Sequence, residues 1–218
     1  MSQTPKTRIR RVPKNARYDR GSVHRVLDRG RVAHVSFASD GQPYCIPTLY
    51  VRLDNRVLIH GSSASRMIRL LASGAPACLT VTILDGWVLA RSAFEHSANY
   101  DSVVLFGRFR AITQPQEKLD ALEAFMEALM PGRWSEVRPP SRRELKATAI
   151  LELEIADASV KTRTGPPDDD DSPDAALNTW AGVIPISRAY GTPEPSHGLR
   201  AGVRRSPSMR LIFGCPVH

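Results

Sequence analysis

The stretch VLIHGSSASRMIRLL, residues 57–71, joins an apolar run to a turn of small hydroxyl residues and then to a second apolar run. The first run predicts a strand, and the spacing of apolar side chains after Ser65 predicts a helix over residues 65–73. The serine hydroxyls, the free N–H groups that open the helix and the guanidinium of Arg66 could together hold an anion, and phosphate fits these donors. A plainer interpretation makes Ser65 an N-cap and Arg66 a solvated charge.

Antiparallel strands are the dominant pattern around this stretch. Short apolar runs are separated by Asp-Gly and Asp-Asn pairs, which favour tight hairpin turns. Turns are expected at Asp40-Gly41, Asp54-Asn55 and Asp85-Gly86. The strands that this pattern predicts cover residues 32–39, 43–53, 56–61, 77–84, 87–93 and 101–112.

Two further segments complete the predicted domain. QEKLDALEAFMEALM, residues 116–130, predicts a surface helix whose buried stripe is ordinary core, formed by Leu119, Leu122, Met126 and Leu129. ATAILELEIA, residues 147–156, alternates and predicts a strand with Glu152 and Glu154 on a wet face. Six or seven strands joined by tight turns, with two helices between them, predict a mainly β fold, a small closed or partly closed barrel.

The net charge of +8 resides at the two ends of the 218-residue chain. Residues 1–31 and 199–218 together hold 14 Lys and Arg against two acids, which leaves residues 32–198 with 16 basic and 20 acidic residues, a net −4. No helix-turn-helix, zinc-ligand or aromatic-basic pattern accompanies the basic ends. The sequence therefore does not favour a nucleic-acid-binding function.

Cysteine usage and hydropathy indicate the compartment. Cys45, Cys78 and Cys215 show no CxxC or Cys/His spacing, so we expect free thiols in a reducing compartment and no metal site. No apolar run follows the basic N-terminus, and the longest uncharged stretch falls short of the roughly 20 residues that span a bilayer. A cytoplasmic protein with no membrane partner is the expectation.

Composition predicts five parts. We expect a basic arm over residues 1–20, a barrel domain over 21–163, an acidic, proline-rich linker over 164–178, a docking segment over 179–190 and a disordered tail over 191–218. The docking segment contains WAGVIPI, headed by Trp180, and could close over a binding site or only cap apolar surface of the sheet.

Six motifs follow one another between residues 10 and 190: RVPKNARYDR, DGQPYCIPTLYVR, LIHGSSASRM, ARSAFEHSANYDSVVLFGR, PGRWSEVR and WAGVIPI. In this order they resemble the pyridoxamine 5'-phosphate oxidase-like family of FMN-binding split barrels, and in particular its flavin-nucleotide-binding branch, which includes nitroimidazole-resistance proteins. The resemblance implies a six-stranded antiparallel split barrel that forms a homodimer with FMN at the subunit interface.

The resemblance also implies which residues contact the flavin. Ser65 and Arg66 would lie at its phosphate, in agreement with the anion pocket inferred from local chemistry. The other positions would contact the ribityl chain and the ring: Pro47, Thr48, His60, Gly61, Ser62, Ser97, Asn99, Tyr100, Ser102 and Trp180.

Two departures from the vitamin-forming oxidases of this superfamily concern the substrate. Arg66 is followed by Met67, where those enzymes carry a lysine, and their arginine motif for pyridoxal phosphate is not recognisable after Trp180. We therefore do not expect pyridoxamine 5'-phosphate to be the substrate.

His60 is the sharpest candidate for a catalytic residue, because an imidazole beside a flavin can relay a proton or ligate a haem. A hydrogen-bonded structural role is the alternative. We expect an FMN-dependent oxidoreductase that acts on a small organic acceptor, with NAD(P)H binding only transiently. The other hypothesis is a non-catalytic protein that binds or senses flavin or haem with the same pocket.

Overall fold

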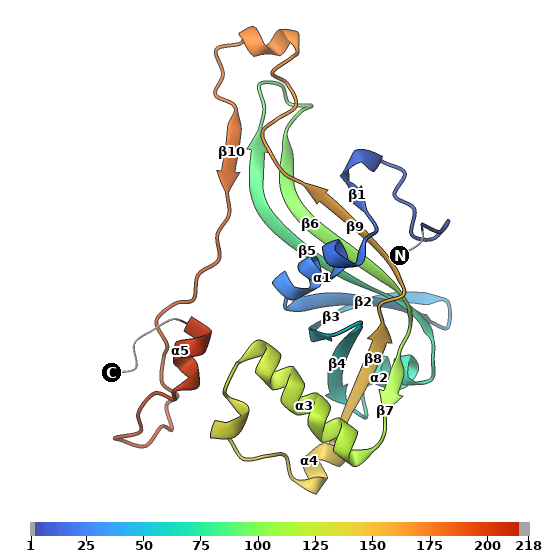
Figure 1. The fold of residues 1–218 in the computed structure, drawn as a ribbon, viewed down its shortest axis with the longest axis vertical. Coiled ribbons are helices and arrows are strands. Elements are labelled where there is room, and N and C mark those ends of the chain that lie inside the picture. The colour runs from blue at the N-terminus through green and yellow to red at the C-terminus, as the bar shows by residue number, and fades with distance from the viewer. Residues whose placement is uncertain (1–2, 214–218) are drawn as a thin grey trace.

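The computed structural model describes residues 3–213, so residues 1–2 of the expected arm and 214–218 of the expected tail lie outside it. Ten antiparallel strands form one sheet that curls into a barrel (Figure 1). The strands are β1 Ala16–Arg17, β2 Val32–Ser39, β3 Gln42–Leu53, β4 Arg56–Ser62, β5 Pro76–Leu89, β6 Ser97–Arg108, β7 Arg110–Ile112, β8 Thr148–Glu154, β9 Asp157–Arg163 and β10 Gly182–Pro185.

Six chain segments close the barrel. In order around it, β5, β2, β3 and β4 are followed by the pair β8–β9 and then by the pair β6–β7, which returns to β5. Each pair acts as one segment, because one residue separates β6 from β7 and two separate β8 from β9. The predicted mainly β, six-stranded barrel is confirmed, and the higher strand count comes from these two breaks together with β1 and β10.

The barrel interior is a continuous apolar core. It is closed by α1 Arg20–Arg29 and α2 Arg66–Ala72, which contribute Val26, Leu27, Ile68 and Leu71 to the buried set. α1 was not predicted from the sequence. It begins where the side chain of Asp19 accepts a hydrogen bond from the backbone N–H of Ser22. α2 confirms the helix expected after Ser65.

Beyond the barrel, β5, β6 and β9 continue as a long extension (Figure 1). We call this extension the wing; it comprises residues 81–89, 97–103 and 160–163, beyond the part of β5 that pairs with β2. Asp101 lies buried at the base of the wing and accepts hydrogen bonds from Arg25, Arg29 and Thr162. Burial alone would raise the pKa of Asp101, but the hydrogen bonds and the two guanidinium charges hold it below its usual value.

The turn expected at Asp85-Gly86 is wrong. β5 continues through both residues with a register shift between Leu84 and Gly86, and the chain turns toward β6 only at residues 90–96. A Cβ atom at Gly86 would lie 2.9 Å from the carbonyl oxygen of Ile184, so the glycine permits β10 to pair closely with β5. Here glycine marks a close approach of two strands rather than a turn.

The outer face of β4 and β8 is covered by α3 Pro115–Leu129, and α4 Arg142–Ala147 leads into β8 (Figure 1). The prediction that β8 has a solvent-exposed face is therefore wrong at Glu152. This residue is 9% exposed and accepts hydrogen bonds from Arg56 at 2.8 Å and from Arg110. The predicted helix is confirmed, but its most buried side chains are Ala121 and Phe125 rather than the expected stripe.

The basic arm lies along the sheet. β1 pairs with β9, and Lys6 and Lys14 form ion pairs with Asp157 at 2.6 Å and Asp168 at 3.4 Å. Short 3-10 turns occur at Pro13–Asn15, Trp134–Glu136 and Pro173–Ala176.

The linker and tail contain ordered contacts. Asp169 is fully buried and accepts hydrogen bonds from the backbone N–H of Arg91 at 2.6 Å and from its guanidinium at 2.8 Å. After β10 the chain is mostly exposed until α5 Ser208–Phe213. The backbone N–H and hydroxyl of Ser208 donate to the carboxylate of Glu136 at 2.8 and 2.6 Å, so part of the tail expected to be disordered is a docked helix. Within residues 3–213, no helix combines the length and apolarity that crossing a membrane requires.

Candidate functional site

Strand β4 presents its side chains alternately to two different parts of the molecule. Val57 and Ile59 belong to the barrel core, together with Ile68 of α2, whereas Leu58 belongs to the apolar cluster under α3. The period of two places His60 on the same face as Leu58 and turns Gly61 toward α2. A Cβ atom at Gly61 would lie 3.1 Å from Cγ1 of Ile68, so this glycine accommodates the helix.

The face of β4 that carries His60 borders a cavity of about 570 Å³ beneath α3. We call it the α3 cavity. Apart from His60 and Arg138, its lining is apolar and comprises Leu49, Leu122, Phe125, Met126, Leu129, Met130, Trp134 and Pro140. Its volume lies in the range of small-molecule and cofactor sites, roughly 300–1,000 Å³.

His60 lines this cavity and has a ring nitrogen without a partner in the described chain. Its ring meets the ring of Phe125 edge to face, with centroids 4.5 Å apart. Its Nδ1 atom is buried and has no hydrogen-bond partner within the described chain. Burial lowers the pKa of His60, so the neutral imidazole, which can ligate a metal, predominates near neutral pH. The alternative interpretation of His60, a structural residue held by hydrogen bonds, therefore has no support at Nδ1.

Arg138 is the cation of the α3 cavity. Its guanidinium donates to both carboxylate oxygens of Glu144, at distances of 2.7 and 2.8 Å. Glu144 also accepts from the backbone N–H of Ser141 in the capping box that begins α4. Arg138 is thus a positioned cation beside an otherwise apolar space.

A polar site of different character lies at the end of β4. We call residues 62–66 the α2 loop. Ser65 has the extended backbone of an N-cap, but its side chain makes no capping hydrogen bond. The guanidinium carbon of Arg66 lies 4.1 Å from the ring centroid of Tyr44, and Nη1 donates to the hydroxyl of Tyr44 at 3.3 Å.

The positive charge of Arg66 has no carboxylate partner among residues 3–213, and the hydroxyl of Ser65 is free to accept or donate. These are the donors that an anion pocket requires. The plainer interpretation of Ser65 as a hydrogen-bonding N-cap does not fit its geometry. Arg66 lies outside the α3 cavity, so His60 and Arg66 face different spaces.

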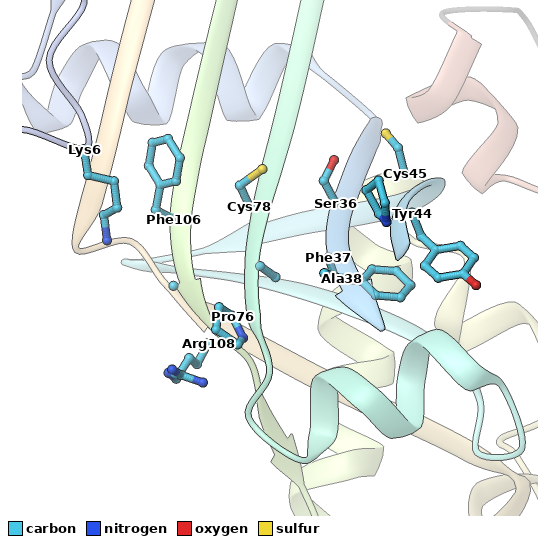
Figure 2. A pocket seen from close by; sticks show the side chains of 13 residues that line it. Lys6, Ser36, Phe37, Ala38, Tyr44, Cys45, Pro76, Cys78, Phe106 and Arg108 are labelled. Carbon is cyan, nitrogen blue, oxygen red and sulfur yellow. The ribbon is translucent and has the colours of Figure 1, made fainter. Parts of the chain in front are cut away.

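Tyr44 connects the α2 loop to a groove of about 840 Å³ at the ends of β2, β3, β5 and β6 (Figure 2). On one cross-strand row, Ser36 lies opposite both Cys45 and Cys78, and Cys78 lies opposite Phe106. Cys45 and Cys78 are free thiols, as predicted, and Cys215 lies outside the described residues. A ligand held at Arg66 would have this apolar groove within reach.

The other predicted site residues are distributed over the sheet. Pro47 is exposed and Thr48 half-buried on β3, and Ser62 is exposed in the α2 loop, where its hydroxyl accepts from the backbone N–H of Ala64. The wing carries four more: Ser97, Asn99, Tyr100 and Ser102. Within a single chain, the wing and the α2 loop lie apart. Trp180 precedes β10 and is 65% exposed.

Two of these residues already have partners on the wing. The side-chain amide of Asn99 donates to the carbonyl of Gly165 at 3.0 Å and accepts from Arg163 at 2.7 Å. The hydroxyl of Ser102 donates to the carbonyl of Lys161 at 3.3 Å. Asn99 therefore has a structural role in joining β6 to the linker.

The α3 cavity was not predicted from the sequence. The helix containing Leu122, Met126 and Leu129 was interpreted as ordinary core, yet these side chains are half-buried and line the space next to His60. The available signal was an apolar surface wider than one stripe, since Met130 and Trp134 continue it past the end of the helix.

Comparison with known proteins gives the family. Residues 19–162 match the family model described as pyridoxamine 5'-phosphate oxidase. The flavocytochrome Anf3 from Azotobacter vinelandii is 41% identical, with a TM-score of 0.91 over 96% of this chain and 97% of that chain. The FAD and heme binding protein from Mycobacterium smegmatis is 40% identical, with a TM-score of 0.87 over 91% of this chain and 97% of that chain. No curated protein matches significantly. With its split barrel, its α2 loop and this match, the chain belongs to the pyridoxamine 5'-phosphate oxidase family.

Proposed function

We propose that this protein is a redox protein that binds a flavin at the α2 loop and a haem in the α3 cavity, with His60 as the haem ligand. The observation that carries the proposal is His60, which lines an apolar cavity and whose buried Nδ1 atom has no partner in residues 3–213. Two proteins about 40% identical to this chain over nearly their whole length are named for a flavin with a cytochrome and for FAD with heme.

The residues around the α3 cavity fit a haem. A porphyrin needs apolar walls, one neutral imidazole and a cation for its carboxylates, and the lining offers each of these. Arg138 would meet the carboxylates in exchange for part of its pairing with Glu144. A flavin exchanges one or two electrons and a haem exchanges one, and the protein supplies binding and orientation.

The residues of the α2 loop fit a flavin phosphate. Arg66 offers an unbalanced charge held against Tyr44, and Ser65 offers a free hydroxyl. The sequence predicts FMN, whereas the names of the two relatives allow FAD; both carry the phosphate that the loop would bind.

A second copy of the chain completes the flavin site in this proposal. The α2 loop and the residues Ser97 to Ser102 of the wing are apart within one chain, and the face around Ser36, Cys45 and Cys78 is not covered by a helix. An isologous dimer would bring the wing of one copy to the loop of the other. Sedimentation of the flavin-loaded protein as a monomer would contradict this part.

The expected activity is oxidation or reduction of a small organic acceptor, with reduced nicotinamide as a transient donor. One observation favours the second candidate, a protein that binds or senses cofactors without turnover. The lining of the α3 cavity holds no acid or base other than His60 and Arg138, and His60 faces away from the α2 loop.

The absorption spectrum of the purified protein tests the proposal. Flavin bands together with a Soret band are expected, and chromatography of the released flavin separates FMN from FAD. Protein that stays colourless after incubation with FMN, FAD and haemin would overturn it. Bleaching of the flavin by anaerobic NADH or NADPH, followed by turnover with an acceptor, would favour the enzyme over the sensor.

A further inference from the structure

A further cleft of about 340 Å³ lies on the wing, away from the α2 loop and the α3 cavity of the same chain. We call it the wing cleft. Its lining includes Ser97 and Tyr100, which the proposed dimer would also bring toward the flavin. Its lining also includes Lys161 and Arg163 of β9, and Phe94 and His96 of the turn between β5 and β6. Lys161 and Arg163 are two residues apart on one strand, so their side chains share a face.

Arg163 is a fixed cation without a carboxylate. Its Nη1 donates to the side-chain oxygen of Asn99 at 2.7 Å and to the carbonyl of Gly165 at 3.3 Å, and Nη2 donates to the carbonyl of Pro166 at 2.9 Å. Neutral acceptors thus orient the guanidinium, and two of its five N–H donors remain free of these contacts. A guanidinium held in this way is already oriented to bind a phosphate.

The charge balance of the wing cleft is positive. Lys161 has no acidic partner in the described part of the chain, and neither has Arg163. Of the two acids in the lining, Asp168 pairs with Lys14 at 3.4 Å, which leaves Glu95 against two cations. The cleft therefore attracts an anion, although an acidic linker borders it.

Flat apolar surface lies next to these cations. The side chain of Phe94 is 90% exposed, and Tyr100 and His96 line the same cleft. Nδ1 of His96 contacts the carbonyl of Ser92 at 2.8 Å, which fixes the imidazole ring. Aromatic faces beside a cation pair can stack a heterocyclic base while its phosphate is neutralised.

We propose that the wing cleft binds a nucleoside phosphate, with the phosphate at Lys161 and Arg163 and the base against Phe94. The binding itself is independent of the proposed cofactors. The identity of the nucleotide does rest on the proposed function. It would be the adenosine end of FAD or the adenosine end of a nicotinamide dinucleotide.

Titration of the protein with ADP, followed by calorimetry, tests the cleft without any flavin or haem. We expect saturable binding that weakens as salt rises. Lys161→Gln should weaken it by about tenfold, and so should Arg163→Gln. Because Arg163 also holds the linker, Lys161→Gln is the cleaner variant, and circular dichroism checks the fold of both. Arg143→Gln, which removes an exposed cation on α4 outside the cleft, should leave ADP binding unchanged.

Two further titrations separate the sources. If the cleft holds the end of FAD, the wild-type protein binds FAD more tightly than FMN, and Lys161→Gln abolishes this difference. If it holds a nicotinamide dinucleotide, Lys161→Gln leaves FAD and FMN binding equal to wild type and weakens NADH or NADPH binding about tenfold.

The proposal is overturned if ADP does not bind, or if it binds with the same affinity to wild type, Lys161→Gln and Arg163→Gln. A protein that binds ADP in the wing cleft but takes up neither flavin nor haem would disprove the proposed function and leave this inference standing.

Discussion

One face of β4 carries His60 toward an apolar cavity, whereas the loop that follows the same strand leads to Ser65 and Arg66 at an open, polar site. The first site has a neutral imidazole, apolar walls and one paired cation. The second has an unpaired cation and free hydroxyls. The two differ in charge, in polarity and in the helix that borders them, although only four residues separate His60 from Ser65.

This contrast teaches that one strand and the loop after it can support two chemistries. Adjacent side chains of a strand point to opposite faces, so His60 faces α3 while Gly61 faces α2, and the chain then leaves the strand for the polar loop. In the proposed function, one space holds a haem and the other the phosphate of a flavin, and β4 is their common support.

The largest expected effect comes from Ile59→Ala. Ile59 is fully buried in the barrel core, so truncation should lower the free energy of unfolding by about 2–5 kcal/mol. Urea unfolding of the cofactor-free protein measures this. A change below about 1 kcal/mol would mean that the two faces of β4 are not packed as differently as the structure indicates.

His60→Ala, one residue further along β4, should have the opposite effect: little change in stability and a large loss of haem affinity. The imidazole loses no hydrogen bond at Nδ1 when removed, so the free energy of unfolding should change by less than about 1.5 kcal/mol. Haem affinity should fall by at least about 100-fold, because the metal loses its ligand.

Haemin titration followed by the Soret band measures this loss, and His34→Ala, an exposed histidine on β2, is the matched control. Flavin affinity should stay unchanged in both variants. If His60→Ala weakens flavin instead of haem, the two sites are one.

Arg66→Gln should act on the flavin alone. Loss of the unpaired guanidinium should weaken flavin binding about tenfold, with haem binding and the free energy of unfolding unchanged. Fluorescence quenching of added flavin measures the affinity. Arg69→Gln, which removes an exposed arginine from the same helix, provides the comparison and should match wild type.

The smallest effect is expected for Tyr44→Leu. The ring under Arg66 orients the guanidinium and contributes about 0.5–1 kcal/mol at such an exposed position. Flavin affinity should therefore fall by roughly two- to fivefold. An equal or larger loss than for Arg66→Gln would indicate that the ring contacts the flavin directly.

Much of the barrel follows from local pattern. The alternating runs predicted β2, β3 and β8, and the apolar spacing after Ser65 predicted α2, because each of these elements is amphipathic along its own length. The turn at Asp85-Gly86 was mispredicted because the same residues can serve a turn or a bulge. Only the distant β10, which packs on Gly86, decides between them.

The candidate site was predictable in part. Ser65 and Arg66 form a local motif, and the structure leaves their donors free. The direction of His60 follows from strand alternation, but the cavity it enters is created by α3, about sixty residues later in the chain. The wet face expected at Glu152 failed for the same reason, since α3 and two arginines cover it. The sequence pattern predicts which side chains share one face of a strand, but it does not predict which distant segment covers that face.

The hairpin between β3 and β4 turns in two residues, Asp54 and Asn55, and sets Leu53 opposite Arg56. Inserting a single residue into β4 after this turn would rotate every later side chain to the reverse side, sending the imidazole into the barrel interior and an isoleucine toward α3. Length variation should therefore be tolerated in the linker far more readily than in this short connection, whose residue count sets which space the imidazole faces.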